Sequence, residues 1–215
     1  AFIRIDLVTP EQAQLIKDIG VTGVFIGLDA WGKEPAKAIR KSGNLEKIFK
    51  CFKTAKECWG DIVHNTTNIV VGLPNDTVEG IYESADWYIE EGHKYIDKLT
   101  YYSFILRSPE ESDIYKSRSI IDAEPDKWGY SFPDEENPYY WERNNGNIKN
   151  SKQSHELMLE VMNKVKPYFR RRLDKYWNQF YDGSATAPQM YYRLTVEDYF
   201  PRLLNVLSKY KNSSN

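Results

Sequence analysis

Strand-like and helix-like segments alternate along the first half of the chain, and this alternation limits the fold more than any other feature. Apolar residues with a period of two predict strands at 2–7, 22–28, 66–71 and 99–106. Capped amphipathic patterns that end at breakers predict helices at 10–19, about 33–40, 45–58 and 77–91. Strands and helices that alternate with short connections favour an α/β fold with parallel strands.

Two architectures fit this order, an open doubly wound sheet and a β/α barrel. A doubly wound sheet packs both of its faces against helices, and both faces are therefore apolar. Here the first strand carries Arg4 and Asp6 on one face, and the third strand carries Thr66 and Asn68 on one face. A barrel lumen tolerates such polar groups. We therefore predict part of a TIM-like (β/α) barrel over residues 1–106.

The second half of the chain, residues 107–215, differs in character. Residues 107–150 are rich in aromatic side chains and lack periodicity, which indicates a long ordered excursion. Apolar residues at helical spacing predict helices from 151 to about 180 and from about 196 to 209. We expect this region to be an aromatic-rich extension with C-terminal helices that cover the partial barrel.

Composition excludes several classes of protein. Of the 215 residues 41% are apolar, too many for a disordered chain, and no apolar run approaches the ~20 residues of a membrane helix. The formal net charge of −2 provides no general field for nucleic acid. Two cysteines cannot form a disulfide framework. We expect a cytoplasmic protein without a membrane or nucleic-acid partner.

Two glycines mark the region where a ligand is expected. Ligands of parallel β/α folds bind at the carboxyl ends of the strands. Gly27 and Gly72 lie near two such ends, on the face that we assign to the lumen. A missing side chain there lets a ligand approach the backbone, or else relieves packing or permits a bend, and both interpretations stay open.

These strand ends resemble motifs of radical S-adenosylmethionine (SAM) enzymes. Residues 27–29 (Gly-Leu-Asp), followed by Lys41, are similar to the fourth-strand motif Gly-x-Glu-Ser, and residues 68–77 to the fifth-strand motif Gly-Leu-Pro-x-x-Thr. Residues 4–7 resemble the third strand. The resemblance covers residues 1–106. The second half resembles, more weakly, the C-terminal extension of a group whose longer members carry an upstream cobalamin-binding domain.

The resemblance implies cofactor contacts for six residues: Asp29, Lys41, Asn68, Val70, Gly72 and Ile105. Asp29 and Lys41 match positions near the methionine part of SAM, and Asn68 matches a ribose contact. Val70 and Ile105 match adenine contacts, and Gly72 matches a point of close approach. Structural alternatives remain, with Lys41 as a helix-terminal charge, Asn68 as an internal hydrogen-bonding group and Val70 as packing.

The family holds a 4Fe-4S cluster with three thiolates in the motif Cys-x-x-x-Cys-x-x-Cys. Cys51 and Cys58, on one predicted helix, do not form that motif. We therefore predict no metal site within this chain. We expect the cluster loop to lie upstream of Ala1 in a longer protein, and the chain alone to be inactive.

The resemblance thus implies the C-terminal part of an enzyme that reductively cleaves SAM and starts radical chemistry on a small-molecule or unknown substrate. An electron donor is the implied partner, and cobalamin is a further implied cofactor if the chain belongs to the second group. The alternative is a non-catalytic β/α module that binds a nucleoside-like ligand or a protein partner. An open-sheet oxidoreductase requires a glycine-rich phosphate turn, which the sequence lacks.

Overall fold

A parallel sheet of four strands organises the protein. The computed structural model describes residues 1–107, 119–132, 140–170 and 200–213. The sheet has the order β1-β2-β3-β4, and all neighbouring strands are parallel. Its strands are β1 (Phe2–Ile3), β2 (Gly23–Asp29), β3 (His64–Val71) and β4 (Lys98–Ser103).

Helices connect successive strands. They are α1 (Pro10–Asp18), α2 (Lys33–Ala38), α3 (Leu45–Trp59) and α4 (Val78–Glu90), with the 3-10 turn η2 (Gly92–Lys94) before β4. Side-chain caps fix where three of them begin, because Thr9, Asn44 and Thr77 each accept a hydrogen bond from the helix backbone. The predicted succession of strands and helices is therefore confirmed from residue 10 to residue 103.

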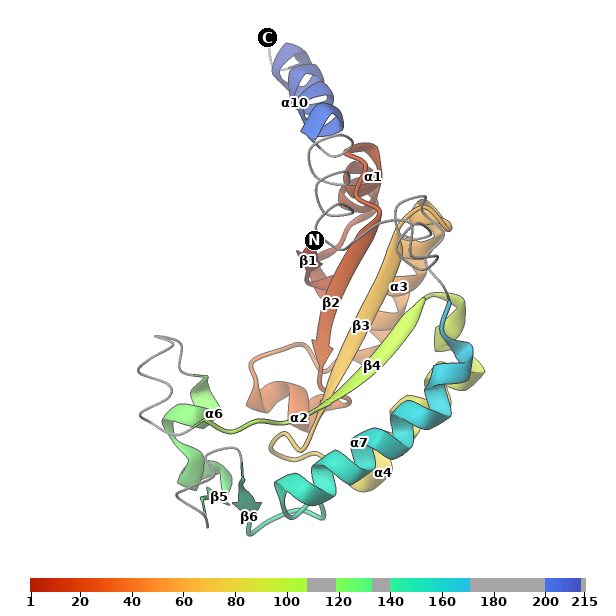
Figure 1. The fold of residues 1–215 in the computed structure, drawn as a ribbon. Coiled ribbons are helices and arrows are strands. Elements are labelled where there is room, and N and C mark those ends of the chain that lie inside the picture. The colour runs from red at the N-terminus through yellow and green to blue at the C-terminus, as the bar shows by residue number, and fades with distance from the viewer. Residues whose placement is uncertain (108–118, 133–139, 171–199, 214–215) are drawn as a thin grey trace, which may run out of the picture.

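The two faces of the sheet differ. Ile26, Ile69 and Val71 are fully buried on one face, and the long helices α3, α4 and α7 (Ser151–Val165) lie along that side (Figure 1). The opposite face carries Phe25 and Asn68, and no described helix covers its middle in Figure 1. A sheet with helices on one side and polar groups on the other matches the predicted partial barrel, not a doubly wound sheet.

The first predicted strand is too long. Strand β1 ends at Ile3, and the 3-10 turn η1 (Ile5–Leu7) follows. The guanidinium of Arg4 donates to both carboxylate oxygens of Asp6, at 3.2 and 2.8 Å. The carbonyls of Arg4 and Ile5 accept hydrogen bonds from the amides three residues on. These local bonds replace strand pairing, although the sequence alternates as a strand does.

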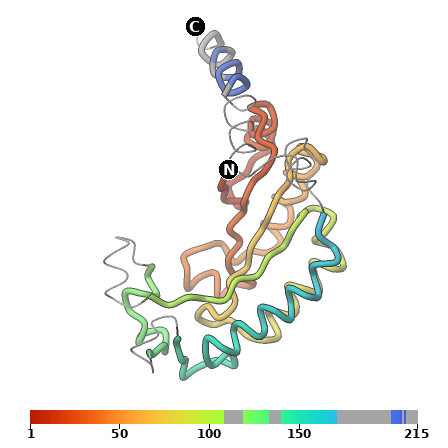
Figure 2. Tube along the Cα trace, in the orientation of Figure 1, coloured from red at the N-terminus to blue at the C-terminus, as the bar shows by residue number. Residues whose placement is uncertain are grey.

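The extension leaves the carboxyl end of β4 and returns to the sheet as helix α7. Figure 2 follows this path through α6 (Ile120–Ala123), η3 (Pro125–Trp128) and the antiparallel pair β5 (Tyr130–Ser131) and β6 (Glu142–Arg143). Trp141 and Tyr130 are buried, so the predicted ordered excursion has a core of its own aromatic side chains.

The C-terminal part is described only in pieces. The predicted helix from 151 is α7, followed at Pro167 by the 3-10 turn η4 (Lys166–Tyr168). Its predicted continuation to residue 180 lies outside the described residues. Helix α10 (Phe200–Ser213) corresponds to the last predicted helix. None of the described helices has the length and apolar character needed to cross a membrane.

Candidate functional site

The carboxyl ends of β2, β3 and β4 meet at one edge of the sheet (Figure 1). Strand β2 contributes Gly27 and Asp29, and β3 contributes Asn68, which pairs with Gly27 in the strand register. Lys41 lies between α2 and α3. Three residues predicted from separate segments of the sequence therefore converge on the face of the sheet that no described helix covers, called the helix-free face below.

Asp29, Lys41 and Asn68 form a connected polar group. The ammonium of Lys41 donates to the Asp29 carboxylate through Oδ2 and to the Gly27 carbonyl at 2.7 Å. The amide nitrogen of Asn68 donates to Asp29 Oδ1 at 2.9 Å. The Lys41 and Asp29 side chains are about a quarter exposed, at 25% and 26%. A half-buried ion pair of this kind is held in one geometry while part of it faces solvent.

The backbone turn at the end of β2 brings the Asp29 carboxylate close to Gly27. The register of β2 against β3 shifts between Gly27 and Asp29, and Asp29 has a φ of 63°. The amide of Ala30 donates to the Leu28 carbonyl at 2.9 Å, which closes a tight turn around Asp29. A side chain on Gly27 would begin 3.2 Å from both Asp29 carboxylate oxygens and from Lys41 Nζ. Glycine at 27 therefore makes room for the pair.

Asn68 supplies an acceptor that the described part of the chain does not use. Its side chain is 7% exposed, and its Oδ1 is buried with no hydrogen-bond partner among the described residues. A buried polar atom without a partner is costly, by about 1–3 kcal/mol. Asn68 Oδ1 is therefore suited to accept a hydrogen bond from a hydroxyl or amine of a ligand on this face.

Apolar and hydroxyl side chains surround Asn68. Val70 follows on the same face of β3 and is half-buried, and it pairs with Tyr102 of β4, which is 51% exposed. Thr100 is the partner of Asn68 in β4 and donates to the Thr67 carbonyl at 3.1 Å. This face therefore combines one polar group with apolar and aromatic surface, the usual composition of a small-molecule site.

Ile105 lies just beyond β4, which ends at Ser103 and not at residue 106 as predicted, and it is 54% exposed. It lines a cavity of about 510 Å³ between the end of β4 and the first turns of α7, together with Tyr102 and Met158. The structure therefore separates Ile105 from the Asp29, Lys41 and Asn68 group. Tyr102 links the two places, because it pairs with Val70 and also lines this cavity.

Gly72 is packed by the extension. Its φ is 99°, and an added Cβ would lie 2.9 Å from the Trp141 ring and 3.0 Å from Ser154 Oγ. The phenol of Tyr130 donates to the Gly72 carbonyl at 2.6 Å. The space that the missing side chain leaves is therefore filled by the protein itself, as the packing interpretation expects. Its contact with a cofactor stays a prediction.

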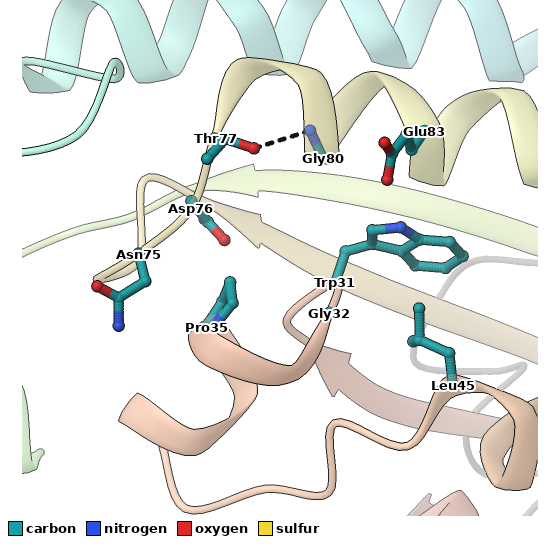
Figure 3. Close-up of a pocket in the computed structure, with 9 residues that line it drawn as sticks. All are labelled: Trp31, Gly32, Pro35, Leu45, Asn75, Asp76, Thr77, Gly80 and Glu83. Atoms are coloured by element: carbon teal, nitrogen blue, oxygen red, sulfur yellow. Dashed lines mark hydrogen bonds between the residues drawn. The ribbon is translucent and has the colours of Figure 1, made fainter.

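A second, smaller cavity of about 210 Å³ lies beside the loop from β3 to α4. Figure 3 shows Asp76 and Glu83 opposite Trp31 and Pro35 across it. The Asp76 side chain is 2% exposed, and its Oδ2 accepts from the amides of Gly72 at 3.0 Å and Leu73 at 2.9 Å. Burial raises the pKa of Asp76 to about 7, although these bonds and the nearby Arg143 oppose the shift.

Sequence reasoning missed Asp76 and Arg143. Arg143 is 3% exposed and donates to the carbonyls of Leu73 at 2.7 Å and Asp76 at 3.3 Å. A buried arginine has the same sequence appearance as a surface one. Asp76 does carry a signal, because an acidic residue between Pro74 and the helix cap Thr77 is typical of a side chain that bonds the turn backbone.

The sequence has two cysteines, the residues that could supply thiolate ligands. Cys51 and Cys58 both lie in α3 and are half-buried. The Cys58 thiol contacts Gln14 Oε1 at 3.2 Å. The described residues contain no group of three His, Cys, Asp or Glu side chains that could hold a metal ion. The donor set therefore does not fit a cluster held by three thiolates.

Comparisons with known proteins bear on the family and the fold. The family model described as "Radical SAM superfamily" matches residues 3–88. The solved structure of coproporphyrinogen III oxidase (HemN) from Escherichia coli, described as a radical SAM enzyme, matches with a TM-score of 0.53 and 14% sequence identity. The match covers 85% of this chain and 37% of that chain. No curated protein matches the sequence. The structural likeness concerns the fold.

Proposed function

We propose, from the match of the radical SAM superfamily model to residues 3–88, that this chain is part of a radical SAM enzyme and binds SAM on the helix-free face of the sheet. It spans 37% of the length of the HemN chain that it resembles. The proposal therefore concerns the part of the reaction that these residues can serve, which is binding and orientation of the cofactor.

One observation carries the proposal. Asn68 Oδ1 is a buried acceptor without a partner among the described residues, on the face that also presents Asp29 and Lys41. A ribose hydroxyl is a donor that would satisfy it. Lys41 is held beside the same carboxylate, where an ammonium suits the carboxylate of a methionine group. A ligand with hydroxyl, amine and carboxylate groups therefore complements all three residues.

Each residue has a separate task in this proposal. Asn68 orients the ligand by accepting from its hydroxyl, and Asp29 accepts from the Asn68 amide nitrogen, so that Oδ1 is the atom left for the ligand. Lys41 neutralises negative charge from Asp29 and from the ligand carboxylate. Val70 and Tyr102 provide apolar surface for a base. When bound and reduced by one electron, SAM supplies a 5′-deoxyadenosyl radical that abstracts hydrogen from a substrate.

The residues do not fit a 4Fe-4S cluster. Such a cluster takes three thiolates, whereas the sequence has two cysteines, both on α3. We therefore assign no step of electron transfer to this chain. Cobalamin, an electron donor and a small-molecule substrate belong to the proposal only as partners of the complete enzyme.

Calorimetric titration of the chain with SAM tests the proposal. We expect weak but saturable binding, and Asn68→Ala should weaken it about tenfold, since one hydrogen bond and the support of Asp29 are lost. Thr67→Val is the matched control. Thr67 is the preceding residue of β3, is fully buried on the opposite face, and its hydroxyl has no partner among the described residues.

Three outcomes separate the alternatives. Binding that Asn68→Ala weakens and Thr67→Val leaves unchanged supports the site. Equal affinity of all three proteins contradicts the assignment of Asn68. If adenosine gives the same heat of binding as SAM, a module for nucleoside-like ligands is favoured. The methionine part of SAM would then contribute nothing through Lys41.

A further inference from the structure

The extension forms hydrogen bonds with the loop that joins β3 to α4. Four of its hydrogen bonds reach the backbone at the rim of the sheet. Tyr130 donates to the Gly72 carbonyl, Arg143 donates to the carbonyls of Leu73 and Asp76, and the Trp141 indole donates to the Phe104 carbonyl at 2.9 Å. The pair β5 and β6 therefore holds the carboxyl ends of β3 and β4 together.

Hydrogen bonds of Asp76, a residue of the loop, also hold the loop backbone. Asp76 accepts from the amides of Gly72 and Leu73, and the Asp76 amide donates to the Leu73 carbonyl at 3.0 Å. Tyr130 bonds the Gly72 carbonyl, and Arg143 bonds the carbonyls of Leu73 and Asp76. The Asp76 carboxylate thus holds two amides of the loop, and the extension holds three of its carbonyls.

Burial of the Arg143 side chain is unfavourable in free energy if its role is packing alone. Its guanidinium is buried, lies 5.7 Å from the centre of the Tyr130 ring, and bonds carbonyls instead of a carboxylate. A buried charge without a directly bonded counter-charge costs more than an apolar side chain of similar volume. An arginine offers a geometric advantage here. Its planar guanidinium has several N–H donors, so it bonds the carbonyls of two loop residues at once.

We propose that Arg143 is a positioning residue for the SAM site, acting through the loop of residues 72–77. The loop continues β3, the strand that presents Asn68 and Val70, and begins at Gly72. Loss of the guanidinium removes one hydrogen bond from each of the Leu73 and Asp76 carbonyls, and we expect the end of β3 then to move relative to β2. The inference rests on the proposed function, and it makes the extension a determinant of cofactor affinity.

Arg143→Ala tests this inference on two readouts, hydrogen exchange and calorimetric SAM affinity. We expect the Gly72 and Leu73 amides to exchange faster while Ile26 in the sheet stays protected, and the dissociation constant for SAM to rise about tenfold. Guanidinium ion at a non-denaturing concentration should restore both, because it refills the vacated space. Arg143→Lys should lie between, since an ammonium lacks the fork.

Val161→Ala is the matched control for general destabilisation. Val161 is fully buried in α7, so its truncation lowers stability without touching the loop. The control should leave SAM affinity unchanged. Unchanged exchange at Gly72 and Leu73 in Arg143→Ala would overturn the positioning role, and faster exchange with unchanged affinity would overturn its link to the cofactor. If the unsubstituted protein does not bind SAM, the proposed function is contradicted, and so is the link between the loop and SAM affinity. The exchange rates of Gly72 and Leu73 still show whether Arg143 holds the loop.

Discussion

The buried carboxyl of Asp76 makes protein stability depend on pH. Its pKa is raised from 3.8 to about 7 by burial. An acid with a higher pKa in the folded chain stabilises the fold most at low pH, and that contribution is lost as pH rises from about 3.8 through about 7. Asp76→Asn removes the charge and keeps an oxygen for the amides of Gly72 and Leu73.

We expect Asp76→Asn to gain stability over the unsubstituted protein as pH rises through this window, by an amount on the order of 4 kcal/mol at its upper end. Urea unfolding at several pH values measures the difference. Asp86→Asn is the control, because Asp86 is exposed on α4 and bonds Lys164 at the surface. A difference between the Asp76 variant and the unsubstituted protein that does not change with pH would contradict the raised pKa.

At the scale of single residues, the sequence indicates which side chains meet but not how they are held. Asp29 ends β2, and Asn68 lies in the carboxyl-terminal half of the neighbouring parallel strand β3. Such segments lie toward the same edge of a parallel sheet, so their convergence is predictable. Their role toward a cofactor stays a prediction. Arg143 lies far along the chain in a segment without periodicity, and no local pattern distinguishes a buried guanidinium from a solvated one.

At the scale of elements, Gly72 marks where β3 meets the extension. Gly72→Ala should destabilise the protein by about 1–3 kcal/mol, because the left-handed backbone is strained and the new Cβ meets Trp141. Gly32→Ala is the matched control. Gly32 has a similar φ of 95°, and nothing lies within 4 Å of its added Cβ. Equal losses of unfolding free energy in the two variants would rule out the Trp141 contact as a cause.

The elements themselves were predictable where local signals agree. Helix α1 has a capping box at Thr9 and Gln12, and the helix begins where that signal indicates. The predicted length of the first strand was wrong because Arg4 and Asp6 alternate as strand residues do, yet their side chains bond each other across a turn. Pairs such as β5 and β6 depend on long-range contacts that a single sequence does not display.

At the scale of the whole molecule, the shortage of thiolates limits what the chain can do alone. After treatment with iron, sulfide and a reductant, the chain should not convert SAM to methionine and 5′-deoxyadenosine, because two cysteines on one helix cannot replace three cluster ligands. Chromatographic assay of both products checks this. Product formation by the chain alone would contradict the assignment of electron transfer to other residues.

The partial barrel was predictable as a whole because its two faces differ in the sequence itself, with polar groups on one and apolar residues on the other. The extension was predictable as an aromatic core but not as the partner of one particular loop. The division into residues 1–106 and 107–215 stays a prediction, and the contacts of Tyr130 and Arg143 with the loop show that the two regions pack together.

The location of SAM on the helix-free face is tested most directly by the nuclear magnetic resonance spectrum of the chain labelled with nitrogen-15, recorded during titration with SAM. We expect saturable shifts of the Asn68 side-chain amide and of the Gly27 backbone amide, with Gly32 and Gly80 beside the smaller cavity unchanged. Shifts confined to Gly32 and Gly80, or no shift at Asn68 at saturating SAM, would contradict that location.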